Sequence, residues 1–204
     1  MRDSTSDRDS CLRRQWGFTL LELMVTVAVA AILLAIAVPA LRVFIENNRQ
    51  DAEADSLISS LDYARSEAVK RDANVEVCAS SVSTTSTTVT PACSDSTAWN
   101  TGWIVETTVA IAGTPGVLQV KSPLQGGNTL SATFDGAGVT QITFEPNGFV
   151  AAAAGAGLYD TTYFTLCDSR GAAYARDIEI SAVGAVEASP TPGQTLNGNA
   201  LACP

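Results

Sequence analysis

The chain has 204 residues, with 12 lysines and arginines against 21 aspartates and glutamates, so its formal net charge is −9. This acidic balance makes the protein as a whole repel polyanions such as DNA and anionic lipid surfaces. The chain contains no histidine, which excludes Ser-His-Asp and Cys-His catalysis and removes the commonest metal ligand. Its length allows one ordinary domain and an additional segment.

An apolar segment runs from Phe18 to Leu41. As a helix it would extend about 36 Å, enough to cross a hydrocarbon core of about 30 Å. Arg13 and Arg14 precede it, so the positive-inside rule puts the N-terminus in the cytoplasm and the C-terminus outside. A secretory signal is the alternative, but its apolar region would be shorter and would end at a small-residue cleavage site. The sequence therefore predicts a single membrane-spanning helix.

The helical pattern continues beyond the apolar segment. Mostly apolar side chains recur there at three- and four-residue steps, and acidic residues occupy much of the remaining helix surface. We predict one helix from Phe18 to about Arg71, kinked or loosened at Pro39, whose ring removes a backbone donor. The recurring positions are Leu57, Ile58, Leu61, Ala64, Arg65, Ala68 and Val69.

Glu22 is the polar exception in the apolar segment. A carboxylate inside a bilayer costs roughly 2.5–3.5 kcal/mol on insertion scales. The run Gly17-Phe18-Thr19-Leu20-Leu21-Glu22, followed later by Pro39, resembles the processing site of type IV pilins and type II secretion pseudopilins. The resemblance implies that a prepilin peptidase cuts between Gly17 and Phe18 and methylates the new amine of Phe18.

The same resemblance implies a role for Glu22 in assembly. Its carboxylate would pair with the Phe18 amine of a neighbouring subunit and so favour one stagger between helices. A buried pair offsets part of a desolvation cost that a lone charge would carry in full. The alternative is a glutamate near a helix end whose side chain reaches out to the membrane interface.

Later stretches resemble the GspH/FimT group of minor pilins and pseudopilins. They include "LDYARSEAVKRDANVEVC", "WNTGWIVE", "ITFEPNGFV" and "FTLCDSRGAAYARDIEISAVGAV", and the likeness extends from Gly17 to about Val186. It implies an α+β, pilin-like fold, in which a long N-terminal helix packs on an antiparallel β-sheet domain with two disulfides. The expected divisions are a leader at 1–17, a transmembrane helix at 18–41, its amphipathic continuation at 42–72 and a β-rich domain at 73–204.

The residues after Asn74 support the β-rich domain directly. Short β-branched runs alternate there with turn residues such as Pro146-Asn147-Gly148 and Ala182-Val183-Gly184. We expect an antiparallel sheet, or two packed sheets, that buries the apolar side of the helix, with Trp103 in the core. The predicted strands are Val75–Cys78, Trp103–Thr108, Val117–Lys121, Leu130–Phe134, Thr140–Phe144, Thr162–Leu166, Asp177–Ser181 and Gly184–Glu187.

The cysteines predict two disulfides. Cys11 lies before the cleavage position and would leave with the leader, so Cys78, Cys93, Cys167 and Cys203 remain. An even count in an exported domain favours disulfides. Three pairings are possible. We favour Cys78–Cys93, which closes the Ser/Thr-rich loop at 80–90, and Cys167–Cys203, which pins the irregular tail. With neither histidine nor CxxC spacing, we expect no metal and no cofactor.

The resemblance implies a structural role and no enzymatic activity. The subunit would be processed, methylated and incorporated into a type II secretion pseudopilus or a type IV pilus. There it would assist assembly or initiation, and thereby protein secretion or pilus-dependent functions. Its partners would be other major and minor pilins or pseudopilins, the prepilin peptidase and the inner-membrane assembly platform. The protein would cross the bacterial inner membrane once, with its C-terminal domain in the periplasm.

Two other functions are weighed against this one. Some relatives capture DNA with a basic Gly-Arg-x-Arg stretch, but the matching place here is Gly184-Ala185-Val186-Glu187. Nonspecific DNA affinity needs Lys or Arg on phosphates, and the chain after Phe18 has 8 basic and 18 acidic residues, so we do not expect nucleic-acid binding. An anchored enzyme is the other possibility, with catalytic acids drawn from Asp160, Asp168, Asp177 and Glu179; we interpret these as solvated strand and turn residues.

Overall fold

The computed structural model describes residues 17–80, 92–111, 114–151 and 161–203. The chain divides into two compact units, Met1–Ile45 and Glu46–Pro204. One helix, α1 (Leu20–Arg71), contributes to both. Its C-terminal end agrees with the sequence-based prediction. It is assigned as helix through Pro39, where the missing backbone donor led us to expect a local loosening.

In the second unit, α1 buries one side. Gln50, Ala54, Leu57, Leu61 and, further along, other residues at three- and four-residue steps are buried, as the periodicity predicts. The sequence pattern placed Val69 on the buried side of the helix, which is wrong because Val69 is 54% exposed. The chain reverses soon after Val69, at Asp72, which has a positive φ of 52°.

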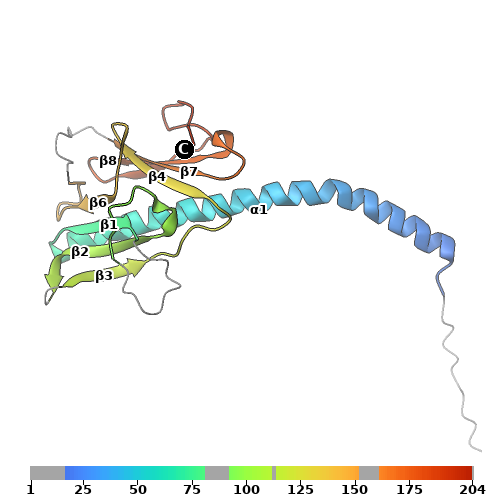
Figure 1. Ribbon diagram of the computed structural model, residues 1–204, viewed down its shortest axis with the longest axis horizontal. Helices are drawn as coiled ribbons and strands as arrows, with labels where there is room; N and C mark the ends of the chain where they lie inside the picture. The colour runs from blue at the N-terminus through green and yellow to red at the C-terminus, as the bar shows by residue number, and fades with distance from the viewer. Residues whose placement is uncertain (1–16, 81–91, 112–113, 152–160, 204) are drawn as a thin grey trace, which may run out of the picture. The chain divides into compact units, whose positions relative to one another are not determined.

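In the part of the chain that the structure describes, nine strands form two antiparallel sheets, and their arrangement can be followed in Figure 1. Short 3₁₀ helices, η1 (Trp99–Thr101) and η2 (Ala172–Tyr174), lie in the connections. The first sheet has the order β3-β2-β1-β6 and contains β1 (Val75–Ala79), β2 (Trp103–Ile111), β3 (Thr114–Val120) and β6 (Gln141–Phe144). The second has the order β5-β4-β7-β8-β9 and contains β4 (Thr129–Phe134), β5 (Ala137–Gly138), β7 (Thr161–Cys167), β8 (Arg176–Ser181) and β9 (Val186–Ala188).

The eight predicted strands are all present, with ends shifted by a few residues. The strand that the sequence did not reveal is β5, a two-residue edge strand after a turn at Asp135 and Gly136. Two residues cannot show an alternating pattern, so periodicity could not have found it. Both predicted turns form, with Gly148 at φ 82° and Gly184 at φ 76°.

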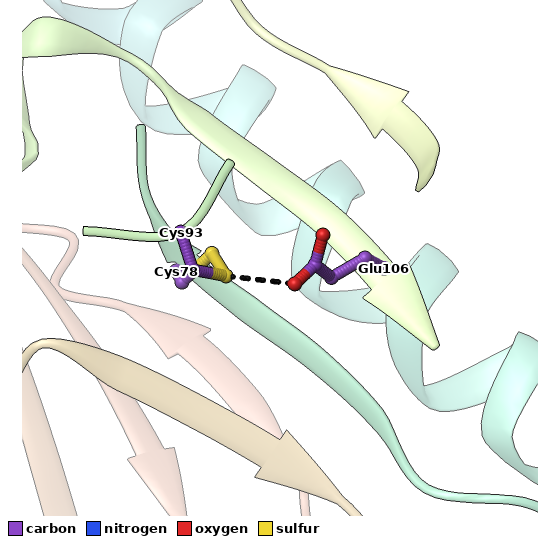
Figure 2. A group of neighbouring side chains, drawn as sticks. All are labelled: Cys78, Cys93 and Glu106. Atoms are coloured by element: carbon purple, nitrogen blue, oxygen red, sulfur yellow. Dashed lines mark hydrogen bonds between the residues drawn. A yellow bond between two sulfur atoms is a disulfide. The ribbon is translucent and has the colours of Figure 1, made fainter. Parts of the chain in front are cut away.

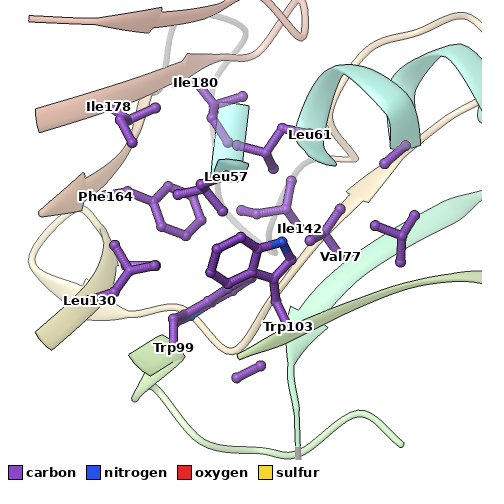
Figure 3. Close-up of a cluster of buried hydrophobic side chains, with 14 of the residues drawn as sticks. Leu57, Leu61, Val77, Trp99, Trp103, Leu130, Ile142, Phe164, Ile178 and Ile180 are labelled. Carbon is purple, nitrogen blue, oxygen red and sulfur yellow. The ribbon is translucent and has the colours of Figure 1, made fainter. Parts of the chain in front are cut away.

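Helix α1 and both sheets contribute to one hydrophobic core (Figure 3). The Trp99 ring packs edge-on against Phe164, with centroids 4.9 Å apart. Its Nε1 donates a hydrogen bond to the Val139 carbonyl at 2.8 Å. Trp103 is also buried, as predicted. Both tryptophans are therefore core residues and offer no binding surface. Other core members are Leu57, Leu61, Val77, Leu130, Ile142, Ile178 and Ile180.

The Leu61 side chain tests the dependence of the fold on this core. It is 0% exposed, and Leu61→Ala should lower the free energy of unfolding by about 2–5 kcal/mol, since a buried cavity is left. The measurement is urea unfolding of the detergent-solubilised protein followed by tryptophan fluorescence. Val69→Ala, on the exposed side of the same helix, should change stability by only about 0.5 kcal/mol or less. Equal losses in the two variants would contradict the core placement.

Candidate assembly site

The first turn of α1 carries the residues of the predicted processing site. Gly17 and Phe18 precede the helix, and the Phe18 side chain is 80% exposed. The Thr19 hydroxyl oxygen accepts a hydrogen bond from the backbone N–H of Glu22 at 3.2 Å. Thr19 is therefore the N-cap of α1 and Glu22 its third residue, which is the spacing of a capping box. The Thr-x-x-Glu spacing is a sequence signal for a helix N-terminus at this place, but the sequence-based prediction did not use it.

Glu22 consequently has a local role in addition to the one predicted for it. An acidic side chain in the first helical turn interacts favourably with the positive end of the helix dipole. This contribution exists in a single subunit and needs no partner. An experiment on Glu22 must therefore separate helix capping from pairing between subunits.

The part of α1 in the first unit presents its apolar side chains outward. A window of 18 residues has a mean hydropathy of 2.7, and none of it is buried. An apolar surface of this extent needs lipid or another protein to cover it. Together with the motif that precedes it, this helix anchors the protein in a membrane. The large exposed side chains include Leu20, Leu21, Leu23, Met24, Ile32, Leu33, Leu34, Ile36 and Leu41.

In the second unit, Arg170 fastens the β7–β8 connection to α1. Its Nη2 lies 2.6 Å from Oδ2 of Asp168, whose side chain is 1% exposed. Its Nε lies 3.2 Å from Oε2 of Glu46. Its Nη1 donates to Oδ1 of Asn47 at 2.8 Å, and Nη2 donates to Oε1 of Gln50 at 3.3 Å. Asp168, one of the four acids considered for catalysis, is thus the partner of a structural arginine.

Arg65 joins two turns to the same helix. Its Nε donates to the Gly148 carbonyl at 3.0 Å, and its Nη2 donates to the Val183 carbonyl at 2.9 Å. The turns touch as well, because a Cβ added to Gly184 would lie within van der Waals overlap of the Gly148 carbonyl. The place that carries a basic stretch in some relatives is therefore a packed turn, and it leads into β9, which contributes the acidic Glu187.

Several other cations of the described residues are held by carboxylates. Arg176 lies 2.7 Å from Asp51. Arg71 and Lys70 both pair with Glu67 at the end of α1, and these two bonds, Arg71 first, lower the pKa of Glu67. Cations engaged in this way are less available for phosphate groups. The described surface thus gives no support to DNA capture.

The structure contains two disulfides in the pairing that the sequence favoured. Cys78 and Cys93 have Cα atoms 5.4 Å apart, and Cys167 and Cys203 have Cα atoms 6.0 Å apart. The first links β1 to the segment before η1, and the second links the end of β7 to the C-terminal segment. The loop predicted at 80–90 and the Ala/Gly connection at 151–157 lie almost wholly outside the described residues, as does Asp160.

An acidic pair lies beside the first disulfide, and one of its members, Glu106, is drawn with the two cysteines in Figure 2. Glu76 and Glu106 are opposite each other on β1 and β2, and Glu106 is 6% exposed. Burial first, and the neighbouring Glu76 second, raise the pKa of Glu106 from 4.5 to about 7. Its Oε1 lies 3.2 Å from Sγ of Cys93. Since a disulfide sulfur has no proton, this contact is a hydrogen bond only in the neutral form of the Glu106 carboxyl, which then donates it.

This group does not form a metal site while the disulfide is intact. The two sulfurs and a Glu106 oxygen lie within 4.8 Å of one another. Metal binding by cysteine needs a thiolate, and these sulfurs are bonded to each other. A second acidic pair, Asp177 and Glu179, lies on β8. Burial first, and then Glu179, raise the pKa of Asp177 from 3.8 to about 7.

These features define a class of protein. A helix with an exposed apolar N-terminal part continues into a disulfide-linked domain of antiparallel sheets, and a processing motif stands before the helix. This is the architecture of a pilin-type subunit anchored in a membrane.

Comparison with known proteins identifies the family. Residues 53–184 match the family described as Type II transport protein GspH, and residues 12–38 match the prokaryotic N-terminal methylation motif. The chain belongs to the GspH family. Curated proteins give no sequence match.

One solved structure shares this fold. A crystal structure of the type IV minor pilin FimU of Pseudomonas aeruginosa has a TM-score of 0.51 and 24% sequence identity, and the match covers 72% of this chain and 92% of that one. A second crystal form of the same minor pilin has a TM-score of 0.48 and 21% identity over 69% of this chain and 92% of that one.

Removal of the Arg170 side chain should destabilise the domain. Arg170→Ala would leave Asp168 buried without its cation, and loss of one partner of a buried ion pair costs about 3–5 kcal/mol. Arg176→Ala is the matched control, because its partner Asp51 is 55% exposed and such pairs contribute about 1 kcal/mol or less. Urea unfolding of both variants gives the comparison. Equally small losses of stability in the two variants would show that the ion pair of Arg170 with Asp168 contributes little to the stability of the domain.

The two raised pKa values predict that stability depends on pH. Above about pH 4.5 the unfolded chain has lost the protons of Glu106 and Asp177, while the folded protein keeps them to about pH 7. The free energy of unfolding should therefore fall as pH rises from about 4.5 to 7 and level off above it. Urea unfolding at pH 5, 6, 7 and 8 with EDTA measures this. Glu106→Gln should make the slope shallower; a stability that rises over this range would contradict the assignment.

Proposed function

We propose that the protein is a minor pilin or pseudopilin that is processed at Gly17. In this proposal a prepilin peptidase removes residues 1–17 and methylates the amine of Phe18. Residues 18–41 then span the inner membrane, 42–72 continue the helix, and 73–204 form the periplasmic domain. The match to the methylation motif over residues 12–38 supports this, as does the exposure of Gly17 and Phe18 ahead of the first helical turn.

The observation that carries the proposed assembly role is the position of Glu22. It is the single charged residue between Phe18 and Leu41, and the apolar surface around it is exposed. In a filament that surface would be covered by helices of neighbouring subunits. A carboxylate enclosed there needs a cation, and the Phe18 amine of a neighbour supplies one. The pair would favour one stagger between adjacent helices.

The subunit would assist assembly or initiation of the filament. Its partners would be other major and minor pilins or pseudopilins, the prepilin peptidase and the inner-membrane assembly platform. The filament is a type II secretion pseudopilus or a type IV pilus, so the role serves protein secretion or pilus-dependent functions. Membership of the GspH family supports a type II secretion pseudopilus. The fold shared with a type IV minor pilin is compatible with a type IV pilus.

Three substitutions of Glu22 separate pairing from helix capping. Glu22→Leu should enter the membrane as well as the natural chain, since the span becomes more apolar, but it should be depleted from filaments. Glu22→Gln keeps a side chain that serves a capping box and loses the charge, so pairing predicts depletion here too. Glu22→Asp keeps the charge with a shorter reach and should be intermediate. The measurement is the amount of tagged protein in sheared filaments relative to the inner membrane.

Processing provides the control for these variants. Mass spectrometry should find the mature chain beginning at a methylated Phe18 in every variant, because Gly17 and the leader are unchanged. If Glu22→Gln enters filaments as well as the natural chain while Glu22→Leu does not, helix capping explains the effect and the pairing role is wrong. If Glu22→Leu also enters normally, the carboxylate has no role in assembly.

A further inference from the structure

The C-terminal segment, residues 194–203, lies over the outer face of the second sheet at β8. Ile178 of β8 belongs to the hydrophobic core, so its neighbours Asp177 and Glu179 lie on the opposite face of the strand. Both are nevertheless buried, with 1% and 8% of the residue exposed. The backbone N–H of Leu196 donates a hydrogen bond to Oε1 of Glu179 at 2.9 Å. The C-terminal segment therefore covers two acidic side chains.

Few apolar contacts hold this segment on the sheet. Its middle is a small hairpin, in which Gln194 bridges Ala200. Among the described residues, none after Val186 contributes to the hydrophobic core, and a cavity of about 250 Å³ lies between the segment and the sheet. The disulfide of Cys203 with Cys167 fastens the far end of the segment. A segment attached in this way opens more easily than the strands of the core.

The two covered carboxyl groups depend on a shared proton. The Asp177 carboxyl interacts with the carboxyl of Glu179 and with the backbone of Leu196. Two buried carboxyl groups in contact repel each other when both are ionised, so one of them keeps its proton in the closed arrangement. The pKa of Asp177, which burial first and Glu179 second raise to about 7, agrees with this geometry.

The surroundings of this acidic pair supply no positive charge. On β7 the titratable group that faces the pair is Tyr163, and on β9 it is Glu187. The C-terminal segment has no charged side chain. Arg176, the preceding residue on β8, is bound to Asp51 of α1, and in the described part of the chain no ion pair involves either carboxyl group. Loss of the shared proton would therefore leave two uncompensated negative charges beneath the segment.

We propose that the C-terminal segment is a proton-controlled cover of the second sheet. While Asp177 and Glu179 share a proton, the segment stays closed over them. When the proton is lost, the two carboxylates repel each other and require water, and the hairpin lifts from β8 to admit it. The disulfide at Cys203 keeps the segment attached, so opening is local. It uncovers the part of the outer sheet face that carries Tyr163 and Thr165.

The direction of the pH effect follows from proton linkage. In the open arrangement Asp177 returns to its ordinary pKa of 3.8, whereas in the closed arrangement it keeps its proton to about pH 7. Opening therefore releases a proton and becomes more favourable as the pH rises between these two values. One proton changes the opening constant by up to about tenfold per pH unit, and the effect levels off above about pH 7.

Amide hydrogen exchange of the detergent-solubilised, disulfide-intact protein at pH 5, 6, 7 and 8 tests the proposal. After correction for the intrinsic effect of pH on exchange, the protection of residues 194–203 should fall at least about tenfold between pH 5 and pH 7 and then level off. Strand β7, which lies in the core, should exchange more slowly than the segment at every pH. Equal exchange of β7 and the segment would show that the whole domain opens, and would contradict a separate cover.

Two substitutions remove one carboxylate each and keep the size of the side chain. Asp177→Asn and Glu179→Gln should make the protection of the segment nearly independent of pH, at the level that the natural protein shows at pH 5. Glu179→Gln also keeps an oxygen that can accept the Leu196 hydrogen bond. Glu106→Gln, which alters the other buried carboxyl, is the matched control and should retain the pH dependence of the segment. Protection that does not change with pH in the natural protein, or an unchanged pH dependence in either folded variant, overturns the proposal.

Discussion

Burial of one side of α1 against both sheets is the contact on which the domain depends. Leu57, Leu61, Ala64 and Ala68 are almost completely buried, and the inward residues of both sheets meet them in one cluster. Strands β6 and β7 alternate between buried and less buried residues because one face lies in this core and the other does not. Without the helical stripe, neither sheet would have a surface to close against.

Polar contacts then fix where each connection lies along the helix. Arg65 bonds two turns, Arg170 bonds the β7–β8 connection, and Glu53 accepts hydrogen bonds from Gln125 and Asn128 between β3 and β4. Apolar packing is non-directional, whereas these bonds require particular atoms at particular distances. They define the register of the loops on the helix, which apolar packing leaves undetermined.

Patterns local in sequence revealed most of the fold. Helical periodicity located α1, alternation located eight strands, and the count of cysteines with their positions led to both disulfides. Contacts between distant residues could not be seen in this way. Arg170 and Asn47 are 123 residues apart, and neither segment contains a sequence pattern that predicts their contact. The same holds for Glu76 with Glu106, because their adjacency depends on the register of two strands. Val69 shows the opposite error, since a periodic pattern does not say where its partner surface ends.

The placement of the disulfides has a mechanical consequence. One links β1 to the segment before η1, and the other links β7 to the C-terminal segment; both join parts of the β-rich region, and neither includes α1. A tensile force applied along α1 would therefore reach the sheets through packing, through the Arg65 and Arg170 bonds and through the backbone that leaves Arg71. These contacts would be loaded in shear and would share the force. The C-terminal segment, in contrast, is covalently closed and would stay folded on its sheet while the helix is pulled.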